Sequence, residues 1–157
     1  MRSSLRKLSR NKLHNYDDNG YYFITICVDE EVHYFGEVGL NNQMYLSEMG
    51  IIAHKLWYEI PNHIDDITVD EFIVMPDHIH GIIIINNTIV NTEARRQNQI
   101  LPVAIGSYKS SVSREIHKFD YFGWQRSYYD KIIRNKTEYL NIKNYIKSNI
   151  KRYNEKM

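Results

Sequence analysis

The chain has 157 residues, of which 43% are hydrophobic and 25% are charged, and its formal net charge is +1 at pH 7. This length and composition are typical of one globular domain, because a second domain of ordinary size would not fit. The apolar runs are too short to cross a bilayer, and the single cysteine, Cys27, excludes an internal disulfide and a zinc site made of several cysteines.

The N-terminal residues 1–19 are expected to form a basic arm outside the core. The first sixteen carry five Lys or Arg and no acidic residue. The arm lacks the apolar stretch of a secretory signal, so we expect a cytoplasmic protein that has no contact with a membrane. Residues 21–29, YYFITICVD, follow the arm and predict a strand, because they are rich in aromatic and β-branched side chains.

The next segment predicts a hairpin and then a helix. Residues 33–39 and 43–48 flank the turn sequence Leu40-Asn41-Asn42, which is typical of a hairpin. Apolar residues then recur at helical spacing after Ser47, a residue type that favours the N-cap position. Pro61 is expected to end this helix, because proline lacks the backbone donor that a helix interior requires.

The second half of the chain predicts a strand pair, a loop and a further helix–strand–helix unit. Residues 67–75 and 78–87 predict two strands, joined by a short turn at Pro76-Asp77. The polar residues 88–102 predict a loop. The elements expected after it are a helix over residues 104–119, a strand over 127–134 and a helix over 137–153, the last with an N-cap at Asn135.

This order of elements predicts an α+β fold in a single domain, residues 1–157. Leaving the hairpin aside, it reads βαββαβ, which is the ferredoxin-like plan. We therefore expect an antiparallel sheet with helices packed on one face, plus an extra N-terminal hairpin and a C-terminal helix.

Two histidines stand out in the stretch FIVMPDHIHGIIII, residues 72–85. On a strand, residues i and i+2 share a face, so His78 and His80 present two imidazoles side by side. Burying an imidazole costs free energy unless the ring is hydrogen-bonded or bound to something. The pair therefore indicates half of a metal site, and the alternative is a pair of hydrogen-bonded core histidines.

The last predicted helix has a polar stripe beside its apolar one. The apolar stripe contains Tyr139, Ile142, Ile146, Ile150 and Tyr153. Tyr145 and Asn149 lie on the neighbouring stripe, one turn apart, so their side chains are expected to be adjacent. The alternative interpretation is that Tyr145 only flanks the core and that Asn149 is solvated.

Charge is unevenly distributed along the chain. Residues 17–75 carry twelve acidic residues and one lysine, whereas residues 126–157 carry nine Lys or Arg and three acidic residues. A basic C-terminal segment with interleaved tyrosines is compatible with a nucleic-acid-binding face. It is equally compatible with an ordinary solvated helix surface.

These motifs together resemble a known family. His78-Ile79-His80 matches the His-hydrophobic-His (HUH) motif, and its setting VMPDHIHGI is close to the family pattern. The segment WQRSYYDKIIRNKTEYLNIKNYIKSN, residues 124–149, resembles the region around the catalytic tyrosine of single-tyrosine HUH transposases. YYFITICV and GSYKSSVSREI also fit, so the similarity to REP-associated tyrosine transposases and to insertion-sequence transposases covers about residues 20–152.

The resemblance implies an enzyme that cleaves and rejoins single-stranded DNA through a phosphotyrosine linked to the 5′ end of the cut strand. It implies that Tyr145 is the nucleophile. It also implies that His78, His80 and Asn149 bind a divalent metal, Mg²⁺ or Mn²⁺. Two imidazoles favour Zn²⁺ or Mn²⁺ over Mg²⁺ by ligand softness.

The expected partner is single-stranded or hairpin DNA, and two copies of the chain are expected to form a homodimer if they share composite sites. Lys109, Arg126 and Arg152 are the candidate DNA contacts, although Lys109 and Arg126 are equally compatible with ordinary surface cations. Three other tyrosines compete with Tyr145 for the role of nucleophile: Tyr128, Tyr129 and Tyr139.

Two further interpretations stay open. One is a non-catalytic or domesticated DNA-binding module with the same fold, and the other is a small metal-binding α+β protein with a different hydrolytic role. The chain also departs from the family pattern, because many relatives have Asn-Pro where it has Asn149-Ile150. Without that proline, we expect the last helix to continue to about Tyr153.

Overall fold

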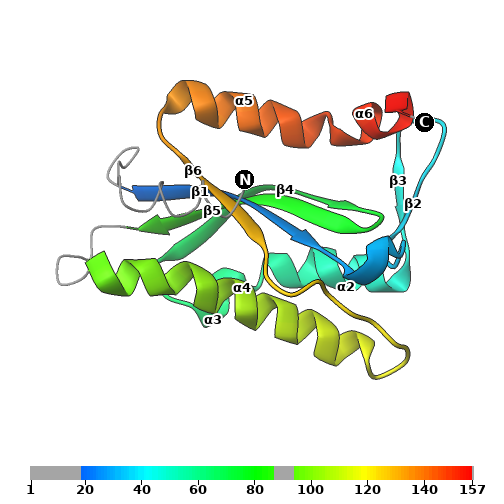
Figure 1. The fold of residues 1–157 in the computed structure, drawn as a ribbon, viewed down its shortest axis with the longest axis horizontal. Coiled ribbons are helices and arrows are strands. Elements are labelled where there is room, and N and C mark those ends of the chain that lie inside the picture. Colours follow the sequence, from blue (N-terminus) through cyan, green and yellow to red (C-terminus); the bar gives the residue numbers. More distant parts are fainter. Residues whose placement is uncertain (1–18, 87–93, 157) are drawn as a thin grey trace.

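The structure, a computed structural model, describes residues 19–86 and 94–156 (Figure 1). The strands are β1 (Asn19–Cys27), β2 (Gly36–Val38), β3 (Met44–Leu46), β4 (Ile67–Met75), β5 (His78–Asn86) and β6 (Tyr129–Ile133). The helices are α2 (Glu48–Trp57), α3 (Ile60–His63), α4 (Ala94–Ile116), α5 (Lys136–Lys147) and α6 (Asn149–Lys156), with a 3-10 turn η1 (Asp29–Glu31). None of the helices in these two ranges is long and apolar enough to cross a membrane.

Four strands form an antiparallel sheet in the order β4-β5-β1-β6. β1 and β5 are the central strands, and the two crossovers run through α2 and α4. This is the strand order of the ferredoxin-like plan, so the predicted fold class is confirmed. β2 and β3 pair with each other as a separate hairpin, also as predicted.

Helices lie on both faces of this sheet (Figure 1). α2, α3 and α4 cover one face, and the C-terminal helices α5 and α6 lie over the other. A large core fills the first face, and it contains Ile24, Ile26, Ala53, Trp57, Ile79, Ile83, Ile105, Tyr108, Val112 and others. A smaller core lies under α5 and is centred on Ile82, Ile133 and Ile146.

The alternation of side chains along β5 divides its residues between these two cores. Ile79, Ile83 and Ile85 point into the large core, whereas Ile82 belongs to the small one. Gly81 lies on the large-core side, where a Cβ atom would come within 2.5 Å of the Trp57 ring. Because residue 81 is glycine, the Trp57 ring packs directly on the backbone of β5, between His80 and Ile82.

The prediction of a loop over residues 88–102 is wrong for residues 94–102, which are helical. α4 begins at Ala94 and includes Pro102, so the helix is ten residues longer at its start than expected. Residues 87–93 lie outside the described ranges, as does the predicted arm up to residue 18. Residues 94–99 read ARRQNQ and contain no large apolar side chain, which explains why the first turns of α4 read as a loop.

Proline was also misread at the end of the first long helix. α2 ends at Trp57, four residues before Pro61, and Pro61 lies in the first turn of the separate short helix α3. A proline in the first turn removes no intrahelical hydrogen bond, because the donors there have no partner within the helix. Pro61 therefore starts a helix here and does not stop one.

The last predicted helix is interrupted. Its first part, α5, ends with Ser148 as the C-cap at φ −95° and ψ 8°, and α6 starts at Asn149. Tyr145 and Asn149 consequently belong to two different helices, which is a correction to the single helix expected over residues 137–153. The predicted N-cap is confirmed, because the Asn135 side chain accepts a hydrogen bond from the Glu138 backbone N–H.

Candidate active site

The strand register places the first residues of the site in one row across the sheet. Thr25 of β1 is paired with His80 of β5 on one side and with Tyr129 of β6 on the other. Directly paired residues of an antiparallel sheet share a face. His78 and His80 therefore lie on the face that α5 covers, side by side as the sequence predicted, with their ring centroids 4.7 Å apart.

His80 is buried and held by one hydrogen bond. Its Nδ1 lies 2.9 Å from Thr25 Oγ1, and its ring stacks on Phe23 with a centroid distance of 5.3 Å. Burial, reinforced by the nearby charges of His78 and Arg152, lowers the pKa of His80 to about 3. The imidazole is therefore neutral at physiological pH, which is the form that binds metals.

His78 is held by its neighbour in the turn. Its Nδ1 lies 2.7 Å from Oδ1 of Asp77. This hydrogen bond is the main cause that lowers the pKa of the Asp77 carboxyl. A carboxylate that accepts from one ring nitrogen fixes the tautomer, so the other nitrogen, Nε2, carries a lone pair.

Tyr145 of α5 lies against this histidine pair. Its ring contacts His80 edge-on at 5.6 Å between centroids and Phe23 at 5.9 Å. The side chain is 42% exposed. Within the described part of the chain its hydroxyl makes no hydrogen bond.

The competing tyrosines are placed differently. The Tyr139 hydroxyl donates to Asp70 Oδ2 and lies 3.1 Å from the Lys143 ammonium, and burial raises the pKa of Tyr139. Tyr128 packs against the large core on the opposite face. Tyr129 shares the histidine face through its pairing with Thr25, so it remains an alternative to Tyr145.

Asn149 and Arg152 both belong to α6. Asn149 is only 8% exposed, and its side chain makes no hydrogen bond to any described residue. The Arg152 guanidinium lies over the Tyr145 ring at 3.9 Å, and its Nη2 donates to the Tyr145 carbonyl oxygen at 2.6 Å. The predicted solvated alternative for Asn149 is thus wrong, because the side chain is buried.

The donor set fits a divalent metal. In the described ranges no three His, Cys, Asp or Glu side chains gather into a metal-binding group. The predicted set is instead two imidazoles and an amide. The Nδ1 atoms of His78 and His80 are hydrogen-bonded to Asp77 and Thr25. This leaves the two Nε2 atoms as the ring nitrogens that could bind a metal. The side-chain oxygen of Asn149 is a ligand type that hard divalent ions accept.

The three predicted DNA contacts have different surroundings. The Lys109 ammonium donates to the carbonyl oxygens of Gln125 and Ser127 at 2.9 and 3.0 Å, and burial lowers the pKa of Lys109. Lys109 therefore braces the segment that precedes β6. Arg126 is exposed within that segment, whereas Arg152 is next to Tyr145. The structure thus brings only Arg152 to the histidine pair.

Sequence reasoning missed four residues on this face of the sheet. Asp77 was read only as a turn residue, although a carboxylate directly before a histidine could have indicated its role. Thr25 and Phe23 carry no such local signal, because they reach His80 only through the pairing of β1 with β5. Lys131 was also missed. It is paired with Phe23, so this exposed cation shares the histidine face.

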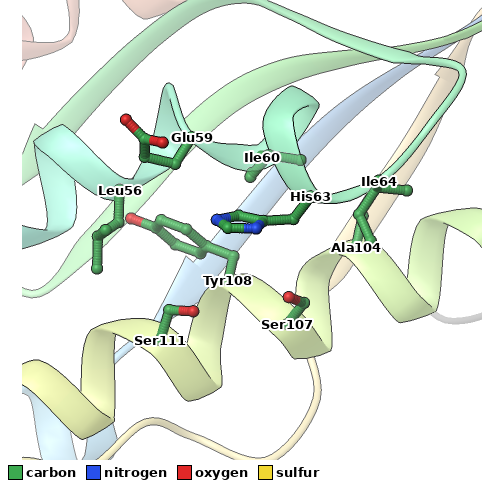
Figure 2. A pocket seen from close by; sticks show the side chains of 9 residues that line it. All are labelled: Leu56, Glu59, Ile60, His63, Ile64, Ala104, Ser107, Tyr108 and Ser111. Atoms are coloured by element: carbon green, nitrogen blue, oxygen red, sulfur yellow. The ribbon is translucent and has the colours of Figure 1, made fainter.

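A hollow between the helices lies far from these residues in the fold. Figure 2 shows it between α2, α3 and α4, on the large-core side of the sheet. It is lined by Leu56, Glu59, Ile60, His63, Ile64, Ala104, Ser107, Tyr108 and Ser111. None of the predicted site residues lines it, so it does not extend the site.

Comparison with known proteins supports the fold and identifies a relative. No protein-family model matches the sequence. A Haemophilus influenzae protein (strain ATCC 51907 / DSM 11121 / KW20 / Rd), called an uncharacterized protein, is 33% identical over 160 residues. The alignment covers 92% of this chain and 87% of that protein.

One solved structure is similar over most of the chain. It is a REP-associated tyrosine transposase bound to a REP hairpin, with a TM-score of 0.62 and 13% sequence identity. The superposition covers 90% of this chain and 73% of the transposase chain. At this identity the likeness establishes a shared fold.

Proposed function

Since the chain belongs to the family of the uncharacterized Haemophilus influenzae protein, whose name assigns no activity, we propose a function from the site itself. The chain is a metal-dependent tyrosine transposase that cleaves and rejoins single-stranded DNA. Its substrate is single-stranded or hairpin DNA, and Tyr145 is its nucleophile. The fold shared with a transposase that binds a DNA hairpin supports this proposal.

The contact between Tyr145 and His80 is the observation that carries the proposal. The tyrosine comes from α5 and the histidine from β5, 65 positions earlier, yet their ring centroids are 5.6 Å apart. A half-exposed phenol that lies beside the neutral imidazole of His80, with His78 next to that ring, is where a phosphate could meet nucleophile and metal together. A tyrosine that only filled the core would be buried.

The reaction exchanges one phosphoester bond for another. The Tyr145 oxygen attacks the scissile phosphorus, and the phenol proton passes to solvent. A bond forms between the tyrosine oxygen and phosphorus, the bond from phosphorus to the 3′ oxygen breaks, and that oxygen takes up a proton. Attack by a 3′-hydroxyl of another strand reverses these changes and joins the strands, so no nucleotide cofactor is consumed.

His78, His80 and Asn149 would hold the divalent metal, Mg²⁺ or Mn²⁺. When bound, such an ion polarises the phosphate and stabilises the charge that develops in the transition state. Asp77 and Thr25 orient the two imidazoles by holding their Nδ1 atoms. Burial around His80 keeps that ring neutral, so no proton competes for its lone pair above about pH 3.

Cations around the site would bind the DNA backbone. Arg152 covers one face of the Tyr145 ring and uses one guanidinium nitrogen on the Tyr145 carbonyl, which leaves further donors for a phosphate. Lys131 and Arg126 are exposed on and beside β6. Phosphate contacts of this kind position a strand without reading its sequence.

The proposal is tested by trapping the covalent intermediate. The full chain is incubated with labelled single-stranded and hairpin DNA pools in Mn²⁺ and analysed on denaturing gels. The wild type is expected to give a protein–DNA adduct that survives SDS. Tyr145→Phe and His80→Ala are expected to abolish it, and Arg152→Ala to reduce it by about tenfold or more.

The control is Tyr139→Phe, which removes a hydroxyl outside the histidine pair and should leave the adduct intact. An adduct that survives Tyr145→Phe and is lost in Tyr129→Phe would move the nucleophile to β6. Tight binding of DNA from these pools with no adduct would support the non-catalytic DNA-binding module, provided that the pools contain the target sequence of the protein.

A further inference from the structure

The side chain of Asn154 hydrogen-bonds the last helix to the β2–β3 hairpin. Asn154 of α6 donates from Nδ2 to the Gly39 carbonyl oxygen at 2.8 Å and to Asn42 Oδ1 at 2.7 Å. Both acceptors belong to the turn between β2 and β3. In Figure 1 the turn end of the hairpin lies beside the C-terminal end of α6.

The turn is itself fixed to receive this contact. Gly39 N donates to the Gln43 carbonyl and Asn42 N donates to the Gly39 carbonyl, at 2.8 and 3.1 Å. Asn42 has φ 61°, a left-handed conformation that asparagine adopts more readily than most residues. The Asn42 side chain is thereby presented from a closed turn, and the hairpin is a rigid partner for α6.

α6 needs such a partner because it is not a continuation of α5. The chain changes conformation at Ser148, directly before Asn149. An eight-residue helix is marginal by itself, so its orientation depends on tertiary contacts. At its first turns, α6 is tied to α5 by the bonds Arg152 N to Ser148 O and Arg152 Nη2 to Tyr145 O. Near its end it is tied to the hairpin by Asn154.

We infer that the β2–β3 hairpin, acting through Asn154, is a positioning element that orients Asn149 as the third metal ligand. Asn154 touches neither metal nor DNA. It holds the last turn of the helix that begins at Asn149, and so it would set the direction in which that helix presents the amide. This inference rests on the proposed metal site, and it gives the hairpin, which pairs with no strand of the main sheet, a place in the reaction.

The experiment measures Mn²⁺ binding to the full chain by the loss of the free-ion EPR signal, without DNA. Asn154→Asp keeps the shape and replaces the donor by an oxygen that repels Gly39 O and Asn42 Oδ1. Its Mn²⁺ dissociation constant is expected to rise about tenfold, the lower end of the effect of losing an outer-shell contact. Asn42→Gly keeps the left-handed turn, loses one acceptor, and should give a smaller rise.

The background variant Asn149→Ala separates positioning from general loosening. If Asn154 acts through Asn149, Asn154→Asp adds no further loss once Asn149 is alanine. An equal loss in that background would overturn the inference, and so would an unchanged dissociation constant in both Asn154→Asp and Asn42→Gly. Glu155→Gln, an exposed change on the same helix, is the matched control and should bind as wild type does.

Failure of the proposed function would look different. If the wild type binds no Mn²⁺, or if His80→Ala binds it as tightly, the metal site itself is wrong, whatever Asn154 does. Melting curves in EDTA identify a variant that does not fold. If Asn154→Asp does not fold, the Mn²⁺ dissociation constant of Asn42→Gly tests the inference, because that change leaves all residues of α6 in place.

Discussion

At the scale of single residues, His80 is a group whose chemistry the fold changes strongly. It is 7% exposed, stacked on Phe23, and bonded to Thr25 through Nδ1. Removing an imidazolium from water costs more than removing a neutral ring, so burial lowers its pKa to about 3. A histidine in this state is neutral at neutral pH, which is the form that can bind a metal, and it is a source of acid instability at lower pH.

The stability of the protein should therefore depend on pH through His80. The unfolded chain binds the proton with a pKa of about 6.5 and the folded chain with a pKa of about 3, so between these values the unfolded state binds more protons. Above pH 6.5 the His80 imidazole is neutral in both the folded and the unfolded chain, so it does not lower the free energy of unfolding. That free energy falls as the pH falls from about 6.5 towards 3. Well inside it, the loss attributable to His80 approaches about 1.4 kcal/mol per pH unit.

Urea unfolding in EDTA from pH 7 to pH 4 checks this expectation. The variant His80→Gln, which keeps a hydrogen-bonding group next to Thr25, should lose stability less steeply than the wild type. Parallel curves for the two proteins would show that His80 does not titrate with a lowered pKa. Other groups, such as Asp77, contribute equally to both curves and cancel in the comparison.

At the scale of elements, capping residues fix where the helices start. Ser47 accepts from the Gly50 backbone N–H at 3.0 Å and donates to the Tyr34 carbonyl at 2.6 Å. The same side chain therefore caps α2 and joins it to the segment before β2. This residue was identified from sequence because an N-cap signal is local.

Ser47→Ala should lower the free energy of unfolding by about 1–2 kcal/mol, since both hydrogen bonds are lost. The measurement is urea denaturation at neutral pH. Ser110→Ala is the matched control: Ser110 is exposed within α4, where alanine is the better helix former, so stability should stay equal or rise slightly. Equal losses in the two variants would contradict the capping role of Ser47.

The element with the least local definition is the end of the chain. The sequence from Thr137 to Tyr153 has continuous helical periodicity, yet the chain divides at Ser148. No proline or glycine marks the division. Its location follows from packing, because α5 lies on the small core while α6 is bound to the β2–β3 turn.

At the scale of the whole molecule, the sheet separates a stabilising face from the site. The large core between β1, β5, α2 and α4 contains most of the fully buried side chains. The small core under α5 has Ile82, Ile133 and Ile146 at its centre and adjoins Phe23, which contacts both His80 and Tyr145. Stability and site geometry should therefore respond to different cores.

The matched pair Ile105→Ala and Ile146→Ala tests this separation. Both side chains are fully buried, one in α4 and one in α5, so each change should cost roughly 2–5 kcal/mol of stability. Only Ile146→Ala should also weaken Mn²⁺ binding and adduct formation, because it loosens α5 next to Tyr145. Mn²⁺ binding and adduct formation are measured for both variants well below their melting temperatures. Equal losses of adduct in the two variants would contradict the idea that the two cores act separately on stability and on site geometry.

The sequence by itself determined the features that depend on residues close together in the chain. The strand period of two placed His78 and His80 on one face, and the caps at Ser47 and Asn135 located two helix starts. The order of the elements was sufficient for the fold class, because few topologies accommodate βαββαβ. Proline was the weak signal, since its effect depends on its position in a helix, as Pro61 and Pro102 illustrate.

Tertiary structure decided which residues meet. Thr25 reaches His80 across 55 positions and Asn154 reaches Asn42 across 112, and neither contact has a periodicity that a local pattern could reveal. The strand register and the division at Ser148 set these contacts. Both result from the burial of side chains from distant segments in common cores, which no short stretch of the sequence specifies.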